Sequence, residues 1–232
     1  RRKKLQIESP VINNDIDANY EVVPKHPSGE YDGKKLSMRS GYFIKTLSEL
    51  LPENRIVFDE ALTNSPPVNK YLPGRAPGER MLTRGGSLGT GFPGAIGAKI
   101  AHPDRCVVGF SGDGGSMYTI QCLWTAARHN VAAKFVVCQN RSYKLLQANI
   151  SQFWKDRGIE GREFPLPFDL SKPEICFNEI ANSFGVAGEQ VVSPAQVKDA
   201  IERMLAHDGP YLINLVLDGA IRPDLIGVHC GQ

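Results

Sequence analysis

Asp113 and Asn140 carry side chains that bind hard metal ions, and each follows an apolar run at the point where a strand would end. Residues 105–111 (RCVVGFS) and 133–139 (AKFVVCQ) are rich in β-branched and apolar side chains, which predicts two buried strands. Open α/β folds bind their ligands at the carboxyl ends of parallel strands, so both side chains are expected at that edge. A carboxylate and an amide oxygen together suit Mg²⁺ or Ca²⁺.

The turn that contains Asp113 is suited to hold a phosphate group next to that metal. It consists of Gly112, Asp113, Gly114, Gly115 and Ser116. A glycine turn between a strand and a helix exposes backbone N–H groups and a helix N-terminus, which together bind anions. Because an aspartate would repel a phosphate, the pattern predicts a cation between the two.

The order of strand, Gly-Asp-Gly turn, helix, strand and asparagine resembles the metal–diphosphate motif of thiamine diphosphate enzymes. Asn140-Arg141-Ser142-Tyr143 is similar to the end of that motif. There the third residue offers its backbone carbonyl to the metal, so the resemblance makes Ser142 a ligand of Mg²⁺. Taken alone, Asp113 is better explained as a helix N-cap and Asn140 as a turn former. Their joint order and spacing favour the metal site.

A second segment, residues 85–89 (GGSLG), resembles the part of these enzymes that holds the aminopyrimidine of the cofactor. A bulky apolar residue, here Leu88, props the cofactor into its bent shape, and the carbonyl two residues earlier, here Gly86, accepts from its 4′-amino group. The resemblance thus gives both residues a part in activating the cofactor. A further loop touches the diphosphate in family members and makes Thr63 a weaker candidate. The cofactor contacts implied are Thr63, Gly86, Ser87, Leu88, Gly112, Asp113, Gly114, Gly115, Ser116, Asn140, Ser142 and Tyr143, and the metal ligands are Asp113, Asn140 and Ser142.

The likeness is greatest to benzoylformate decarboxylase-like and acetolactate synthase-like enzymes, and it covers roughly residues 55–219. It implies a parent lyase or carboligase in which thiamine diphosphate, held by Mg²⁺, forms an ylide that attacks the 2-oxo group of a 2-oxo acid. Lys144-Leu145-Leu146 stands where biosynthetic acetohydroxyacid synthases carry Met-x-x-Gln-Trp, which counts against the branched-chain enzyme. Benzoylformate, phenylpyruvate, pyruvate and a coenzyme A thioester all remain open as substrates.

The resemblance also implies a partner. In the family a separate pyrimidine-binding domain, usually from a second subunit, supplies a glutamate that protonates the aminopyrimidine. The chain has no matching glutamate motif, so we expect it to bind the cofactor weakly and to lack turnover alone. The parent enzyme is expected to be a homodimer or homotetramer. The missing initial methionine and a long N-terminal arm favour a fragment over a natural small subunit.

Three other interpretations compete with a decarboxylase fragment. The chain could be one subunit of a two-chain decarboxylase, or a non-catalytic binding module, although the intact Asp113, Asn140 and Leu88 argue against decay of the site. It could also be another Mg²⁺–phosphate enzyme, such as a phosphotransferase. That interpretation is last, because the chain lacks a GxxxxGK[ST] loop and a second carboxylate beside Asp113.

Composition and charge limit the classes of protein to which the chain can belong. A net charge of +2 over 232 residues makes no strong case for nucleic acid binding. No apolar run approaches the roughly 20 residues of a membrane span, and no signal peptide is evident. The cysteines form no CxxC pair, which indicates buried free thiols and a cytoplasmic location. They are Cys106, Cys122, Cys138, Cys176 and Cys230.

Alternating strand and helix patterns over residues 37–219 predict a doubly wound α/β domain with a mostly parallel sheet and helices on both faces. Residues 1–36 are expected to form an irregular arm or linker, and 220–232 an irregular tail. Strands are expected at 55–60, 80–83, 105–111, 133–139, 189–192 and 211–217, and helices at 40–51, after Pro66, and at 91–101, 117–129, 143–154, 177–184 and 194–207. Residues 155–173 are expected to be a long loop. Small residues in 91–101 should let that helix approach its neighbours closely.

Overall fold

The computed structural model describes residues 30–31, 34–35, 38–83, 86–160 and 162–219, and within them six strands form one sheet in the order β4-β3-β5-β6-β8-β7. All five neighbouring pairs are parallel, which confirms the doubly wound α/β fold. The strands are β3 (Arg55–Glu60), β4 (Arg80–Leu82), β5 (Cys106–Gly112), β6 (Lys134–Gln139), β7 (Ala187–Val191) and β8 (Tyr211–Val216).

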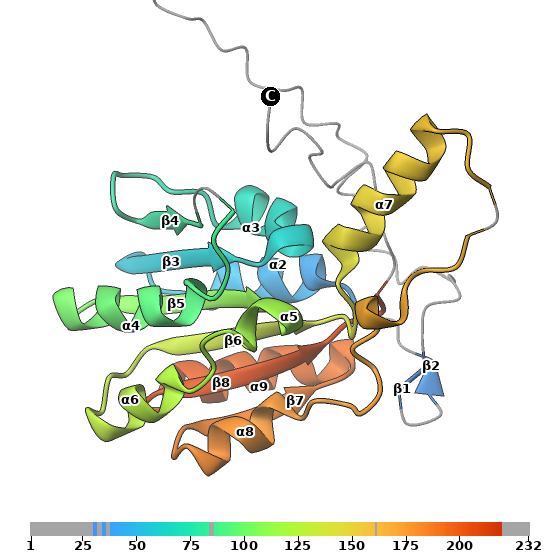
Figure 1. Ribbon diagram of the computed structural model, residues 1–232. Helices are drawn as coiled ribbons and strands as arrows, with labels where there is room; N and C mark the ends of the chain where they lie inside the picture. The colour runs from blue at the N-terminus through green and yellow to red at the C-terminus, as the bar shows by residue number, and fades with distance from the viewer. Residues whose placement is uncertain (1–29, 32–33, 36–37, 84–85, 161, 220–232) are drawn as a thin grey trace, which may run out of the picture.

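Helices cover both faces of the sheet, and Figure 1 shows α4, α6 and α8 on one side with α2 and α9 on the other. The helices are α2 (Ser40–Leu50), α3 (Ser65–Tyr71), α4 (Gly91–Ala101), α5 (Asp113–Ser116), α6 (Cys122–Arg128), α7 (Lys144–Asp156), α8 (Phe177–Ser183) and α9 (Pro194–Ala206). Short 3₁₀ helices η1 (Leu62–Asn64) and η2 (Leu166–Phe168) lie in the connections. None of the helices in the described part of the chain is long and apolar enough to cross a membrane.

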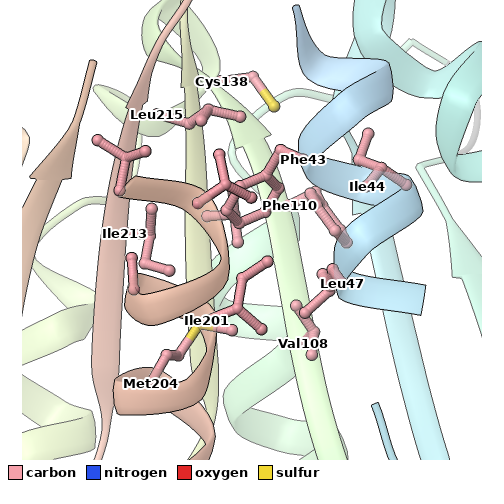
Figure 2. Close-up of a cluster of buried hydrophobic side chains, with 14 of the residues drawn as sticks. Phe43, Ile44, Leu47, Val108, Phe110, Cys138, Ile201, Met204, Ile213 and Leu215 are labelled. Atoms are coloured by element: carbon pink, nitrogen blue, oxygen red, sulfur yellow. The ribbon is translucent and has the colours of Figure 1, made fainter. Parts of the chain in front are cut away.

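Apolar side chains fill the space between the sheet and each helix layer. In one layer, Phe43 of α2 packs with Phe110 of β5 and Ile201 of α9, as Figure 2 shows. All six residues of β6, and all six of β8, are buried. Such continuous burial is what a parallel sheet covered on both faces requires, and it explains why these strands are apolar without alternation.

Helix α4 packs directly on the sheet, as its small residues predict. A Cβ added at Gly94 would lie 2.2 Å from Cε2 of Phe58, and one added at Gly109 would lie 2.7 Å from Cβ of Ala95. Both distances are too short for carbon atoms, so glycine allows the close approach of α4 to β3 and β5.

Two connections differ from the sequence-based expectation. Of the helix expected over 117–129, only α6 (Cys122–Arg128) forms, because residues 117–121 are turns that follow the short helix α5. In that stretch the hydroxyl of Thr119 donates to the carbonyl oxygen of Gly89 at 2.7 Å, a tertiary contact that ties these turns to the segment before α4. The loop expected over 155–173 is also partly ordered, because α7 continues to Asp156 and η2 follows.

The ends of the chain are only partly described. Two two-residue strands, β1 (Glu30–Tyr31) and β2 (Lys34–Lys35), pair antiparallel inside the region expected to be an arm. The rest of that arm and the tail over 220–232, which includes Cys230, lie outside the described residues.

Candidate functional site

The candidate site lies at the carboxyl edge of the sheet, where the chain leaves β3, β5 and β6. From β3 the chain enters α3, which packs in one helix layer, whereas from β5 it enters α5 and α6, and α6 packs in the other. Neighbouring strands whose connections leave to opposite faces create a crevice, the usual ligand site of a doubly wound sheet. The predicted residues therefore stand where this fold binds ligands.

Asp113 is a buried carboxylate aimed at the segment that follows β6. It is the first residue of α5 and is 4% exposed. Its Oδ1 accepts from the N–H of Gly114 at 2.9 Å, and its Oδ2 accepts from the N–H of Arg141 at 2.5 Å. Burial raises the pKa of Asp113 to about 6, while backbone N–H groups, including those of Ser142 and Asn140, oppose the rise. A carboxylate removed from water in this way gains strongly from a cation.

Residues 140–142 form the other side of this site. The Oδ1 of Asn140 accepts from the N–H of Ser142 at 3.1 Å, and Arg141 between them adopts a left-handed φ of 59°. Ser142 is buried, and its hydroxyl oxygen has no hydrogen-bond partner among the described residues. Its carbonyl oxygen accepts from the N–H of Lys144 at 2.8 Å. The turn that carries this amide and this backbone carbonyl is therefore joined to Asp113 through backbone N–H groups, and metal binding by the three residues stays a prediction.

Tyr143 and the glycine turn are in direct contact. A Cβ added at Gly114 would lie 2.3 Å from Cε1 of Tyr143, so the aromatic ring rests on the backbone of the turn. The hydroxyl of Ser116 donates to the carbonyl oxygen of Gly112 at 2.8 Å, which closes the turn. These contacts place all of the predicted diphosphate-side residues except Thr63 in one contiguous unit.

Thr63 lies nearby but makes no specific contact that supports its assignment. It is half-buried in η1, and η1 lies against β5 and α7. Its contact with a diphosphate therefore stays a prediction.

The second predicted segment, residues 85–89, is described from Gly86 onward and lies beside the turn after α5. Gly86 and Ser87 are exposed, and Leu88 is 37% exposed. A Cβ added at Gly89 would lie 2.7 Å from Cβ of Tyr118, so this segment packs directly on the residues that follow the glycine turn. The two halves of the predicted site are therefore adjacent.

Sequence reasoning missed two charged residues at this edge. Glu60, the last residue of β3, is 1% exposed and accepts hydrogen bonds from the backbone N–H groups of Gly89 and Gly91. Lys144 begins α7, where burial lowers the pKa of its ammonium group and the Asp113 carboxylate acts in the opposite direction. Two acidic residues directly after the apolar run Ile56–Phe58 were the available signal for Glu60.

Within the described residues, no group of three His, Cys, Asp or Glu side chains is arranged to hold a metal ion. The predicted ligand set is of another kind, since it combines one carboxylate, one amide and one backbone carbonyl. Hard cations accept such oxygen sets.

Comparison with known proteins decides the family. Residues 66–215 match the family model described as "Thiamine pyrophosphate enzyme, C-terminal TPP binding domain". The chain belongs to this family. The resemblance inferred from the Gly-Asp-Gly and GGSLG motifs is therefore confirmed, and so is thiamine diphosphate as the cofactor of the family.

Relatives of this chain include a decarboxylase and an acetolactate synthase subunit. The chain is 29% identical to benzoylformate decarboxylase of Pseudomonas aeruginosa over 195 residues, which cover 84% of this chain and 35% of the relative. It is 26% identical to the acetolactate synthase isozyme 2 large subunit of Escherichia coli (strain K12) over 213 residues, 91% of this chain and 37% of the relative.

A solved structure agrees with the first group. The thiamine diphosphate-dependent 4-hydroxybenzoylformate decarboxylase of Rhodococcus jostii RHA1 superposes with a TM-score of 0.70 and 26% identity, covering 85% of this chain and 36% of that chain. The chain thus spans about a third of the length of the relatives it matches.

Proposed function

We propose that this chain is the diphosphate-binding part of a Mg²⁺-dependent thiamine diphosphate enzyme that acts on a 2-oxo acid as a decarboxylase or carboligase of the benzoylformate decarboxylase type. The observation that carries the proposal is the convergence of Asp113 with residues 140–142 at the carboxyl edge. Similarity to decarboxylases over most of the chain supports it.

The residues present fit both the cofactor and the metal. Asp113, Asn140 and the carbonyl of Ser142 would hold Mg²⁺, and the desolvated carboxylate would gain a counter-ion. Backbone N–H groups of Gly115 and Ser116 would bind diphosphate oxygens beside the metal, since that of Gly114 donates to Asp113. Leu88, exposed on the adjacent segment, would support the aminopyrimidine side, with the Gly86 carbonyl as its hydrogen-bond acceptor.

When bound, thiamine diphosphate supplies a nucleophilic carbon and an electron sink for the loss of CO₂ from a 2-oxo acid. The contribution of the chain is to bind and orient this group. Asp113 and Asn140 would fix the charged end, while Leu88 would set the conformation of the other end, so that reacting atoms are held at a high effective concentration. A pyrimidine-binding domain of the same enzyme or of a second subunit would complete the site.

An acetolactate synthase-like activity is the second candidate, favoured by the match to the Escherichia coli subunit over 91% of the chain. Helix α7 favours the decarboxylase instead. Leu146 and Phe153 of α7 are 45% and 52% exposed, and this helix begins directly after the predicted metal ligands. Apolar side chains there suit a 2-oxo acid with an apolar or aromatic substituent better than pyruvate.

Calorimetric titration with thiamine diphosphate, with Mg²⁺ and after chelation, tests the proposal. We expect binding that requires Mg²⁺ and that Asp113→Ala abolishes. The matched control is Asp104→Ala, which removes an exposed carboxylate at the turn before β5. Binding that survives both chelation and Asp113→Ala would contradict the assigned metal site. Absence of binding by both the chain and its assembly with the pyrimidine-binding domain would contradict the function.

A further inference from the structure

Glu60 is a buried carboxylate with backbone partners far away in the sequence. Its Oε1 accepts from the N–H of Gly89 at 2.5 Å, and its Oε2 accepts from the N–H of Gly91. Burial raises the pKa of Glu60, while the N–H groups of Gly89, Gly91 and Thr90 act in the opposite direction. The carboxylate therefore joins the end of β3 to residues 89–91, where α4 begins.

Neighbouring charges do not explain why a carboxylate is buried at position 60. The charged neighbour that affects it is Asp59, which raises its pKa further, and Asp59 is itself paired with Arg80 at 2.6 Å. In the described part of the chain, no lysine or arginine forms an ion pair with Glu60. Backbone N–H groups at the start of α4 are therefore what offset the cost of burying this carboxylate.

The same carboxylate also touches the glycine turn after β5. A Cβ added at Gly115 would lie 3.0 Å from Oε1 of Glu60, and one added at Gly91 would lie 2.9 Å from Oε2. A side chain at Gly91 or Gly115 would therefore occupy the space that the Glu60 carboxylate fills. Glu60 thus lies between the turn that carries Asp113 and the segment that carries Leu88.

Gly89 is held on its other side as well. The Thr119 hydroxyl donates to the Gly89 carbonyl, and Gly89 has a left-handed φ of 79°. With its N–H bound by Glu60 and its carbonyl bound by Thr119, Gly89 has little freedom to rotate. The neighbouring Leu88 has a side chain that is partly exposed, so its position depends on this anchored glycine.

We propose that Glu60 is a positioning residue that fixes residues 86–90, and with them Leu88, at a set distance from the turn that carries Asp113. The inference rests on the proposed function, in which one rigid cofactor must reach both segments at once. A segment that drifts relative to the turn would still allow the diphosphate end to bind, but it would misplace the support for the aminopyrimidine end.

Amide hydrogen exchange in the complete chain tests the anchoring without any ligand. Glu60→Gln keeps the size of the side chain but places an NH₂ group against a backbone N–H. We expect exchange at Gly89 and Gly91 to become about tenfold faster or more, while the second half of α4 is unchanged. Glu189→Gln is the matched control, because Glu189 is a hydrogen-bonded carboxylate on β7, where it accepts from Arg203 and Tyr211. Unchanged exchange in Glu60→Gln, or equal acceleration throughout α4, would overturn the proposal.

Binding to two probes tests the consequence for the site. We expect Glu60→Gln to weaken binding of thiamine diphosphate about tenfold and binding of magnesium pyrophosphate less than about twofold. Asp113→Ala should weaken both, and Glu189→Gln neither. A parallel loss of both probes in Glu60→Gln, or no loss, would overturn the positioning role. If neither the unmodified chain nor its assembly with the pyrimidine-binding domain bound either probe, the proposed function would fail, whereas hydrogen exchange would still decide the role of Glu60.

Discussion

At the scale of single residues, the site is governed by two carboxylates that are both buried and both bonded to backbone N–H groups. Asp113 faces residues 140–142, whereas Glu60 faces residues 89–91. Burial raises the pKa of each. Backbone N–H groups bond both oxygens of each carboxylate. Asp113 differs in that its partner segment, residues 140–142, also carries an amide and a backbone carbonyl, a set of oxygens that suits a cation.

The raised pKa of Asp113 predicts how metal binding depends on pH. The folded-state pKa of Asp113 is about 6, against an ordinary 3.8. Its protonated form therefore stabilises the metal-free fold below pH 3.8, and this contribution to the free energy of unfolding is lost as the pH rises through 6. Mg²⁺ needs the carboxylate, so its binding has the opposite dependence. We expect Mg²⁺-dependent affinity to fall about tenfold per pH unit below about 6 and to level off above it.

Calorimetric titration of magnesium pyrophosphate from about pH 5 to about pH 8 measures this dependence. Pyrophosphate has protonation equilibria of its own, so the comparison is with Asp113→Asn under the same conditions, in which the ligand contributes equally. The difference between the two proteins should shrink as the pH falls. A difference that is constant over the whole range would mean that Asp113 does not exchange a proton for the metal.

At the scale of elements, small residues decide how closely α4 packs on the sheet. Gly109 lies in the middle of β5 under this helix, and a Cβ there would also come 3.0 Å from the carbonyl oxygen of Gly91. Since α4 begins at residues that Glu60 holds, its position against β5 also sets the position of the segment before it. Packing of one helix is therefore part of the geometry of the site.

Gly109→Ala tests this packing. We expect a loss of about 1–3 kcal/mol in the free energy of unfolding, because α4 must move away from β5 to admit the methyl group. Gly97→Ala, in α4 itself, is the matched control. Nothing lies within 4 Å of a Cβ added there, so alanine should stabilise the helix by up to about 1 kcal/mol. Denaturant unfolding of both variants measures the difference. Equal stability of the two would show that the contact of α4 with β5 is not tight.

The elements that could be predicted from sequence are those with local signals. Helix α4 has the predicted bounds, and β5 and β6 differ by one residue at their ends, because apolar runs between turn residues mark them. The break between α5 and α6 could not be predicted, since the bond of Thr119 to Gly89 spans 30 residues. The role of Glu60 could not be predicted for the same reason, because its hydrogen-bond partners lie 29 and 31 residues away. The contact of Asp113 with the segment that begins at Asn140 could be predicted, because the two motifs resemble a pair that the family brings together.

At the scale of the whole molecule, the proposed function makes the chain one side of a cofactor site. It covers about a third of the length of its relatives, and its predicted aminopyrimidine segment is open to the surface. Apolar side chains continue from this segment along the same helix layer: Met117 is 47% exposed, Tyr118 60% and Trp124 51%. Exposed apolar side chains beside the proposed cofactor site are suited to contact with another domain.

The proposed function predicts binding without turnover. The chain would supply groups for the metal and the diphosphate, whereas the acid that would protonate the aminopyrimidine is expected from the pyrimidine-binding domain. With Mg²⁺ and thiamine diphosphate present, we therefore expect CO₂ release from benzoylformate or pyruvate to stay at the rate of the free cofactor. Adding the pyrimidine-binding domain should raise the rate by several orders of magnitude, because enzymes typically accelerate reactions by at least about 10⁶-fold. Asp113→Ala in the same assembly is the control, since it removes the metal site and should return the rate to the background. Turnover by the chain alone would mean that one of its own residues performs the proton transfer, and Glu60 would be the first carboxylate to substitute.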